Sequence, residues 1–406
     1  MEILHINISD YDYLLPEERI AKYPLPLRDS SKLLIYRNGM IEESIFSRID
    51  EIIPAGSLLV MNDSRVPRLR LMMNKETGAK IEILCLEPVE PDTHASILTQ
   101  KERCIWNCYV GNLSKWKGGT VCCSSESLTL TARLCGTSAD MQQVEFTWNK
   151  TGYTFSDILE EFGSIPIPPY LNRKDELIDR ERYINVYSEV YGSAAAPTAG
   201  FHFTEELLGR LKNTARTAEI TLHVSASTFK PVQSPELSGH RMHEEQFFVK
   251  PSIINELLRS QNRTIAVGTT TLRALESLYH IGCYLSDHPG AHPHDLSVNQ
   301  WQPYDTNNHL PAERALENIL EYMNRRGLDE LPAVTRILIA PGYEFKIAKG
   351  LITNFHQPRS TLLLLVSAFV DGNWRKIYDY ALERDFRFLS YGDSSILLGK
   401  DFGADE

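Results

Sequence analysis

Apolar runs and alternating stretches divide the chain into two kinds of segment. The apolar run Ser57–Met61 ends abruptly in Asn62-Asp63-Ser64-Arg65, which is typical of a buried strand that leads into a polar loop. After residue 67 the pattern changes to short β-rich or alternating runs, separated by turns rich in Gly, Ser and Lys. These runs are Lys80–Leu86, Cys104–Val110, Ser127–Leu134 and Gln143–Trp148. The pattern predicts a small antiparallel β-barrel.

From residue 151 onward, helical and strand patterns alternate. Thr204 is placed to cap a helix, Ile220–Val224 alternates as a strand, and Pro251–Arg259 carries a proline at a predicted helix start. The strand Thr264–Val267 then leads through Gly268-Thr269-Thr270 into another helix. Backbone N–H groups in such a turn can hold an anion, but an ordinary strand-to-helix junction fits the same pattern.

These patterns predict an α/β main domain with an inserted antiparallel β-barrel domain. Residues 1–66 and 151–406 form the α/β domain, and residues 67–150 form the barrel. The stretch 281–329 is rich in Pro, Asn and His and has one helical piece, Pro311–Arg325, so we expect a peripheral excursion there.

Charge and composition narrow the class of protein. The 406 residues carry a formal net charge of −11, so an RNA site must be a local patch, while a cationic substrate such as a sulfonium suits this balance. The longest apolar run, Thr361–Val370, is too short to span a bilayer, and Met1-Glu2-Ile3 lacks the start of a signal peptide. We expect a cytosolic protein without membrane contact.

Residue spacing disfavours metal and disulfide sites. The seven cysteines include no CxxC pair, which fits reduced thiols. Six of them fall between Cys85 and Cys135, where a zinc cluster is the alternative to small buried side chains. His288, His292 and His294 lie in a polar loop, where metal binding is again the less favoured alternative. We predict no metal site, and the Walker A, GxGxxG, GxSxG and HExxH motifs are absent.

Two histidine segments are candidates for proton transfer. Alternation along Ile220–Ser225 places His223 on the polar face of the predicted strand, where a structural and a functional histidine are both open. The segment His240-Arg241-Met242-His243-Glu244-Glu245 holds two imidazoles and two carboxylates. This composition suits acid–base chemistry or substrate contact, with a metal pair or a polar surface as alternatives.

A third candidate is a run of small residues. The segment Gly192–Gly200 leads into Phe201-His202-Phe203, directly ahead of the predicted helix start at Thr204. Small residues let a ligand approach the backbone, and Phe201 or Phe203 would offer a ring for stacking on a base. Core packing is the alternative. We predict a binding loop.

A dozen short motifs in order resemble the S-adenosylmethionine:tRNA ribosyltransferase-isomerases of queuosine biosynthesis. The resemblance extends from Tyr11-Asp12-Tyr13 to Ser390-Tyr391-Gly392-Asp393 and so covers nearly the whole chain. The motifs between these are Tyr23-Pro24-Leu25-Pro26-Leu27-Arg28-Asp29, Asn62-Asp63-Ser64-Arg65-Val66, Lys75-Glu76-Thr77-Gly78, Asp179-Arg180-Glu181-Arg182-Tyr183, Ala195–Gly200 with His202-Phe203-Thr204, Thr221-Leu222-His223-Val224, Met242-His243, Gly268-Thr269-Thr270, Pro341-Gly342-Tyr343 and Thr353-Asn354-Phe355-His356.

The resemblance implies a transfer reaction on tRNA. The ribosyl part of S-adenosylmethionine would move to 7-aminomethyl-7-deazaguanine at the wobble position, giving epoxyqueuosine, adenine and methionine. S-adenosylmethionine would be consumed as a co-substrate, with no separate cofactor. The partners would be S-adenosylmethionine and tRNA carrying the deazaguanine base, and we expect a monomer. The resemblance also implies an α/β domain joined to a β-barrel.

This chemistry needs a base beside the sulfonium, an acid for adenine departure and a site that holds the amine near the sugar. The resemblance then points to His202, His223 and His243 for proton transfer, with Asp63 and Glu245 as orienting carboxylates. The expected substrate contacts are Arg65, Thr198, Gly200, Phe203, Thr270, His356, Tyr391 and Asp393.

Three departures from the family pattern leave the acceptor open. Ser225 and Ser227 stand where the family has glycine, Ile184-Asn185 stands where it usually has Gln-Thr, and the excursion 281–329 is longer than usual. The alternatives are therefore a divergent relative that uses S-adenosylmethionine with another acceptor, and a non-catalytic RNA-binding module.

Overall fold

The chain folds into two compact units in the computed structural model. The structure describes residues 5–66, 68–138, 141–193, 195–224, 232, 234–260, 262–305 and 310–404. The first unit comprises Met1–Ser64, Ile184–Glu189 and Pro197–Glu406, and the second comprises Arg65–Tyr183 and Val190–Ala196. Ser225 and Ser227, where the chain departs from the family pattern, lie outside the described residues.

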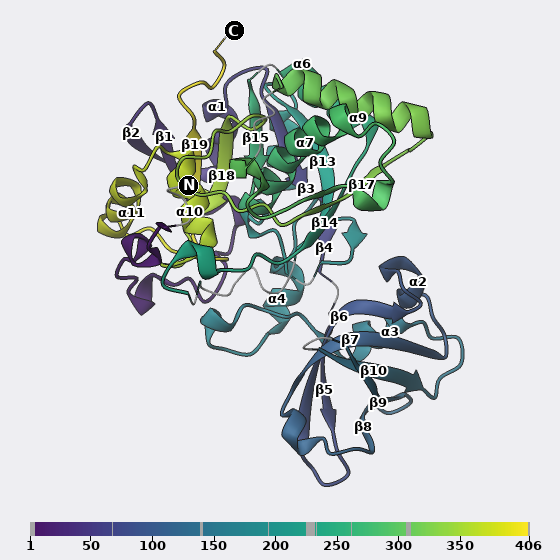
Figure 1. Ribbon diagram of the computed structural model, residues 1–406. Helices are drawn as coiled ribbons and strands as arrows, with labels where there is room; N and C mark the ends of the chain where they lie inside the picture. Colours follow the sequence, from purple (N-terminus) through teal and green to yellow (C-terminus); the bar gives the residue numbers. More distant parts are fainter. Residues whose placement is uncertain are drawn as a thin grey trace. The chain divides into compact units, whose positions relative to one another are not determined.

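A mixed ten-stranded sheet forms the centre of the first unit (Figure 1). Its strands, in spatial order, are β16 (Ser297–Val298), β17 (Leu331–Thr335), β14 (Glu245–Val249), β13 (Arg216–His223), β3 (Leu58–Asn62), β15 (Thr264–Val267), β18 (Gly350–Asn354), β19 (Ser394–Leu398), β1 (Lys32–Arg37) and β2 (Met40–Ile45). The four central neighbours β13, β3, β15 and β18 run parallel. β3 and β15 are buried along their whole length, as expected for parallel strands covered on both faces.

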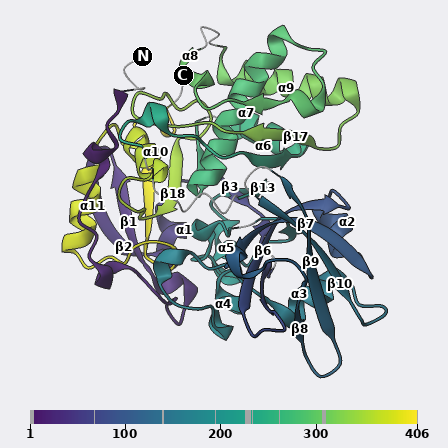
Figure 2. The same cartoon turned by 60° about the horizontal axis from the view of Figure 1, so that its bottom comes forward.

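Helices cover both faces of this sheet. One group, α6 (Pro251–Ser260), α7 (Thr269–Asp287) and α9 (Ala312–Arg326), lies together over one face, as Figures 1 and 2 show. On the opposite face, α1 (Ile49–Ile52) and α5 (Glu205–Leu211) share one apolar core with the strands. The remaining helices of this unit are α8 (Gln302–Asp305), α10 (Thr361–Phe369) and α11 (Trp374–Glu383).

The predicted excursion 281–329 is built into this layer. α7 continues to Asp287, β16 adds a strand at the edge of the sheet, and α9 begins and ends within one residue of the predicted helix Pro311–Arg325. α9 buries six side chains, because its apolar positions recur on one face. These are Ala315, Leu316, Asn318, Ile319, Tyr322 and Met323.

The second unit contains the antiparallel barrel. Six strands close on each other in the order β5 (Arg70–Asn74), β6 (Lys80–Glu90), β7 (Arg103–Gly111), β10 (Met141–Trp148), β9 (Thr129–Ser138) and β8 (Thr120–Ser124), with β8 pairing back to β5. Burial alternates along these strands, so Trp106, Val144 and Phe146 fill the interior. The predicted fold class, an α/β domain with an antiparallel β-barrel, is confirmed.

This unit continues past residue 150, where the sequence pattern places the end of the barrel. Helix α3 (Phe155–Phe162) begins with a capping box between Thr154 and Asp157 and buries Phe155, Ile158 and Leu159 in the barrel core. The helix belongs to the barrel because its apolar stripe closes the barrel interior. The other elements are α2 (His94–Leu98), α4 (Leu177–Arg182), β11 (Gly163–Ser164), and β12 (Val190–Tyr191), which pairs with β4 (Ser64–Arg65).

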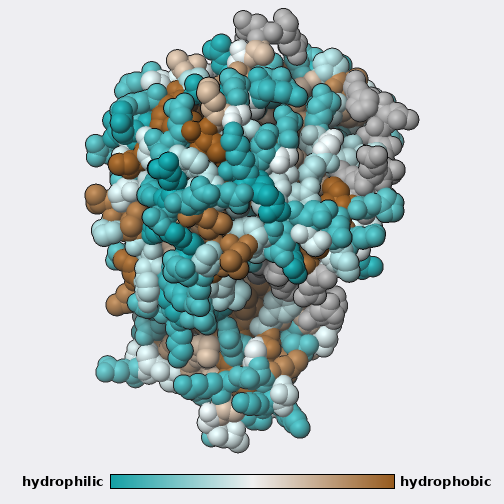
Figure 3. All heavy atoms as spheres, turned by 90° about the vertical axis from the view of Figure 1, so that its left-hand side faces the viewer, coloured by the Kyte–Doolittle hydropathy of each residue, from teal (hydrophilic) through white to brown (hydrophobic). Residues whose placement is uncertain are grey.

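Hydrophilic residues predominate on the face of the molecule that Figure 3 draws, and apolar residues occur there in small separate groups. In the part of the chain that the structure describes, we find no helix whose length and apolar character would let it cross a membrane.

Candidate active site

The carboxyl ends of four parallel strands meet at one edge of the ten-stranded sheet, which we call the carboxyl edge. Asp63 directly follows β3, His223 ends β13, Thr270 lies in the turn after β15, and His356 closely follows β18. Open α/β sheets bind their ligands outside this edge. Four sequence-predicted residues, separated by up to 293 positions, therefore reach one place in the fold.

Antiparallel strands bring further predicted residues to the same edge. β14 begins at Glu245 beside the end of β13, and β19 begins one residue after Asp393, beside the end of β18. Neighbouring strands lie ~4.8 Å apart, so the six strands from β14 to β19 span roughly 24 Å of the edge. The predicted residues thus form two groups, one near β14, β13 and β3 and one near β18 and β19.

A buried chain of charged contacts organises the first group. The Arg273 guanidinium on α7 donates from Nη1 to Oε2 of Glu245 at 2.6 Å, and Nε donates to the Ile337 carbonyl at 3.1 Å. The other carboxylate oxygen of Glu245 lies 3.3 Å from Nε2 of His243. Arg273 and Glu245 are 3% and 0% exposed, whereas His243 is 17% exposed. The buried ion pair therefore holds a carboxylate against an imidazole that solvent and ligands can reach.

Asp63 and His223 lie on the adjacent strands. The Thr221 hydroxyl donates to Asp63 Oδ1 at 2.8 Å. Burial raises the pKa of Asp63, and the charges of Glu189 and Glu330 add to the rise, while Thr221 and Lys250 oppose it. The His223 ring is half-buried, 5.6 Å from the ring of Phe248 and edge-on to it. This part of the edge combines a desolvated carboxylate, an imidazole and further acidic groups.

His202 has a different environment. Ser31 Oγ lies 2.8 Å from its Nδ1, and Asn354 Oδ1 lies 3.0 Å from its Nε2. Burial lowers the pKa of His202 to about 4, so the imidazole is neutral at pH 7. With both nitrogens engaged and the side chain buried, this histidine joins three segments of the first unit. These contacts favour a positioning role, and its part in proton transfer stays a prediction.

The predicted residues of the second group, near β18 and β19, are also held by hydrogen bonds and ring contacts. The Thr353 hydroxyl lies 2.9 Å from His356 Nε2, and burial lowers the pKa of His356 to about 3. Asp393 accepts hydrogen bonds from the backbone N–H groups of Lys32 at 3.0 Å and Arg387 at 2.7 Å. Tyr391 is buried with its ring 6.0 Å from that of Phe201.

The turn Gly268-Thr269-Thr270 lies between these groups, at the start of α7. Gly268 has a φ of +97°, in the left-handed region that favours glycine, and its N–H donates to the Ile352 carbonyl at 2.8 Å. The first turn of this 19-residue helix presents free N–H groups and the positive end of its dipole. Thr198 lies close by, since a Cβ added to Gly268 would be 3.7 Å from that of Ala199.

Three predicted contacts lie elsewhere or serve packing. A Cβ on Gly200 would come within 2.0 Å of the Tyr187 hydroxyl, so this glycine is needed for close packing. Phe203 is fully buried, edge-on to Phe46 at 5.0 Å, which favours a core role over base stacking. Arg65 belongs to the second unit, where its guanidinium lies 5.0 Å from the Tyr191 ring centroid. Their roles as substrate contacts stay predictions.

Sequence reasoning missed Arg273 and Asn354. Arg273 lies in a helix whose other residues are mainly apolar. A charged side chain in such a helix requires a partner, so the sequence alone could have indicated that Arg273 is paired. Asn354 lies inside a motif that was recognised, but its contact with His202 spans 152 positions. That pairing depends on the tertiary structure.

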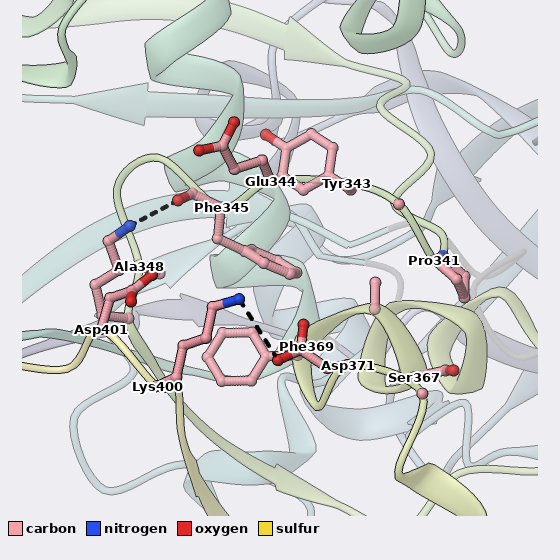
Figure 4. A pocket seen from close by; sticks show the side chains of 15 residues that line it. Pro341, Tyr343, Glu344, Phe345, Ala348, Ser367, Phe369, Asp371, Lys400 and Asp401 are labelled. Atoms are coloured by element: carbon pink, nitrogen blue, oxygen red, sulfur yellow. Dashed lines mark hydrogen bonds and ion pairs between the residues drawn. The ribbon is translucent and has the colours of Figure 1, made fainter. Parts of the chain in front are cut away.

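A hollow of about 330 Å³ lies at the opposite edge of the sheet (Figure 4). It lies at the start of β18 and the end of β19, and Lys400 points toward Asp371 across it at 3.9 Å. The rings of Phe345 and Phe369 meet there at 4.8 Å. The described residues that line this hollow include none of the predicted site residues.

No cluster of three or more His, Cys, Asp or Glu side chains suited to a metal ion is found in the described ranges. The carboxyl edge itself presents imidazoles, carboxylates and backbone N–H groups.

Comparison with known proteins connects this chain to one family. The profile of the family described as "Queuosine biosynthesis protein" matches residues 8–397. A protein of Fusobacterium nucleatum named S-adenosylmethionine:tRNA ribosyltransferase-isomerase is 37% identical over 398 residues, covering 96% of each chain. A protein of Legionella pneumophila (strain Lens) with the same name is 36% identical over 403 residues, covering 97% of this chain and all of its own.

Among solved structures, the crystal structure of an S-adenosylmethionine tRNA ribosyltransferase from Thermotoga maritima is similar to this chain. The two sequences are 28% identical, and the alignment covers 96% of this chain and 100% of that one, with a TM-score of 0.45.

Proposed function

The chain belongs to the queuosine biosynthesis protein family, and from this premise we propose that it is an S-adenosylmethionine:tRNA ribosyltransferase-isomerase. It transfers and isomerises the ribosyl part of S-adenosylmethionine onto 7-aminomethyl-7-deazaguanine in tRNA, giving epoxyqueuosine-tRNA, adenine and methionine. The observation that carries the proposal is the convergence of Asp63, His223, Glu245 and Thr270 on the carboxyl edge.

The donor binds at the centre of this edge. The sulfonium lies near Asp63, where Glu189 and Glu219 add negative potential, and the methionine carboxylate takes N–H groups at the start of α7. The positive sulfonium thus lies near negative carboxylates, and the negative methionine carboxylate lies near the positive end of the α7 dipole. S-adenosylmethionine is consumed as a co-substrate, and the reaction uses no resident cofactor.

The two proton steps fall to two half-buried histidines of the first group. His223 takes the proton from the carbon beside the sulfonium, and His243 gives a proton to adenine as its bond to the sugar breaks. Glu245, fixed by Arg273, holds the His243 imidazole in position for the transfer. His202, which is buried, and His356, which is half-buried, are neutral and hold the surrounding segments in place.

Adenine release tests the reaction directly. The protein is incubated with S-adenosylmethionine and with tRNA that carries the deazaguanine base or lacks it. Adenine should form only with the modified tRNA. Release driven by another acceptor would indicate a divergent relative, and tRNA binding without any release would indicate a non-catalytic RNA-binding module.

His223→Ala should abolish adenine release while the circular dichroism spectrum stays that of the wild type. His288→Ala, which changes an exposed histidine on another part of the unit, is the matched control and should keep full activity. An active His223→Ala enzyme would remove this histidine from the mechanism.

We also propose that the enzyme acts in the cytosol as a monomer. All seven cysteines are free, which suits a reducing compartment. Light scattering on the purified protein tests the monomer, and a dimer mass at working concentration would contradict it.

A further inference from the structure

A second, larger hollow extends along the carboxyl edge beyond the residues discussed so far. Its volume is about 1090 Å³, and it is lined by the segment before β14, by Arg336 after β17 and by the segment after β16. We call it the Trp301 hollow. The lining residues that matter here are Arg241, His243, Asn299, Gln300, Trp301 and Gln302.

His243 belongs to both sites. It is held by Glu245 at the carboxyl edge and also lines the Trp301 hollow. The hollow is therefore continuous with the place where we assign adenine departure. A ligand in it would lie beside the reacting groups.

The walls of the hollow are held in place by hydrogen bonds. Gln300 accepts from the Met242 N–H at 3.0 Å and donates to the His240 carbonyl at 2.8 Å, so it ties the two walls together. Gln302 accepts from the Asn299 N–H at 3.0 Å. Trp301 is half-buried and packs against the apolar cluster that contains Met242. The hollow is thus largely preformed, which lowers the entropic cost of binding.

The lining offers groups that an RNA nucleotide can use, alongside two carboxylates, Glu244 and Asp295. An indole offers a face for a base, the Asn299 and Gln302 amides offer donors and acceptors for a base edge, and Arg241 offers a positive charge to a phosphate. Arg241 is exposed, and among the described residues it has no ion-pair partner. Arg336, by contrast, is paired with Glu244.

We propose that the Trp301 hollow binds a nucleotide of the tRNA that neighbours the one being modified. This inference rests on the proposed function and adds a subsite to it. The hollow begins at His243 and reaches β16, two strand spacings of ~4.8 Å or roughly 10 Å beyond β14, so it extends well past the place of adenine departure. An RNA chain continues past its modified base over such a distance, which favours tRNA over the adenine of the donor as the occupant.

The inference gives the stretch 281–329 a role in substrate binding. Asn299, Gln300, Trp301 and Gln302 all come from this stretch. The segment 299–302 that follows β16 is therefore part of the tRNA-binding surface.

Two variants of Trp301 separate stacking from packing. Trp301→Leu keeps an apolar side chain but removes the aromatic face, so the Kd and KM for tRNA should rise about ten-fold, as expected for one lost base stack. The KM for S-adenosylmethionine should stay within about two-fold. Trp301→Phe keeps a ring and should bind tRNA nearly as well as the wild type.

An RNA change at the partner position provides the complementary test. Anticodon stem-loops are prepared in which one nucleotide on either side of the wobble position is abasic. One of these should weaken binding to the wild type about ten-fold and leave Kd for Trp301→Leu unchanged, because that variant has already lost the stack. Equal losses for both proteins would overturn the inference.

Arg241→Ala tests the phosphate contact. The slope of log Kd against log salt should become shallower by about one for this variant. Arg325→Ala removes an exposed arginine on α9, outside the hollow, and should leave the slope unchanged. Equal slopes for Arg241→Ala and the wild type would remove the phosphate contact.

The outcomes distinguish this inference from the proposed function. Direct tRNA titration reports on the hollow even if the protein releases no adenine, so a failed reaction leaves the subsite testable. A rise in KM for S-adenosylmethionine alone in Trp301→Leu would assign the hollow to the donor and overturn the inference. Unchanged tRNA affinity in Trp301→Leu would also overturn it.

Discussion

Arg273 shows how a single buried charge can organise the site. Its guanidinium lies in the interior, bonded to Glu245 and to the Ile337 carbonyl, and one further nitrogen, Nη2, has no hydrogen-bond partner among the described residues. A buried ion pair adds little net stability, but loss of one partner leaves an uncompensated charge. The pair therefore acts chiefly to fix Glu245, and through it His243.

Replacement of Arg273 by Met should lower the free energy of unfolding by about 3 kcal/mol, because Glu245 is left buried and unpaired. The kcat for adenine release should fall at least about ten-fold as His243 loses its fixed partner. Chemical denaturation and steady-state kinetics measure the two effects. Arg314→Met, which removes two exposed surface ion pairs on α9, is the control and should change the kcat not at all and the free energy of unfolding by less than about 1 kcal/mol.

A double variant sharpens this test. Arg273→Met combined with Glu245→Gln removes both charges and should recover part of the lost stability, although not the activity. Additive destabilisation in the double variant would contradict a direct ion pair.

His202 predicts a pH dependence of stability. Its pKa falls from the ordinary 6.5 to about 4 in the folded protein. Above about pH 6.5 the imidazole is neutral in both states, so its contribution is fully present. As pH falls from there toward 4, the unfolded chain binds a proton that the folded chain does not, and about 3 kcal/mol of stability is lost.

Urea denaturation at several pH values measures this loss. His202→Gln should show a flatter stability profile than the wild type between pH 6.5 and 4, whereas His292→Gln, at an exposed position, should keep the wild-type profile. The raised pKa of Asp63 in the folded state has the opposite effect on the pH dependence of stability. Asp63 is present in all three proteins, so it does not change the comparison between them. Parallel profiles for His202→Gln and the wild type would contradict the prediction.

At the scale of elements, α7 links the carboxyl edge to the rest of the first unit. Its first turn carries Thr270, its second carries Arg273, and its third carries Glu276. The Glu276 carboxylate accepts from the backbone N–H groups of residues 346–348 and from the Tyr343 hydroxyl at 2.8 Å. Burial raises the pKa of Glu276. One helix thus positions site residues and also anchors the loop that precedes β18.

The close contact of α7 with α9 predicts the effect of a small substitution. A Cβ on Gly282 would lie 2.1 Å from the Ala315 carbonyl oxygen, so Gly282→Ala must push the two helices apart. We expect a loss of about 2 kcal/mol in unfolding free energy. Gly209→Ala, on α5 with open space around the new methyl group, is the matched control and should stabilise the protein slightly. Equal stabilities for the two variants would contradict the close packing.

At the scale of the whole molecule, the charge balance sets the conditions for tRNA binding. A net charge of −11 repels a polyanion at long range, so binding depends on local cations. The affinity for tRNA should therefore fall steeply as salt rises, with a log–log slope equal to several released counterions. Filter binding between about 50 and 200 mM salt measures the slope, and an affinity independent of salt would exclude phosphate contacts as its main source.

The barrel and the α/β pattern could both be predicted from the sequence. A strand that is buried on one face alternates between apolar and polar residues, whereas a strand that is buried on both faces is apolar throughout. The barrel runs alternate, and the fully buried run at Leu58–Asn62 ends in polar residues. The helix α3 was not assigned to the barrel, since an apolar stripe shows that a face is buried but does not identify what covers it. The pairing of Arg273 with Glu245 escaped prediction for the same reason.

The sequence by itself determined the elements, the polar residues at the strand ends and the family, because each depends on local period or on motifs in order. Only the tertiary structure decided that β13, β3, β15 and β18 are neighbours, and hence that Asp63, His223, Thr270 and His356 share one edge. Strand order depends on contacts between residues far apart in the chain, and a local sequence pattern carries no information about such contacts. The same holds for His202, whose contacts with Ser31 and Asn354 join segments far apart in the chain, while its role in proton transfer stays a prediction.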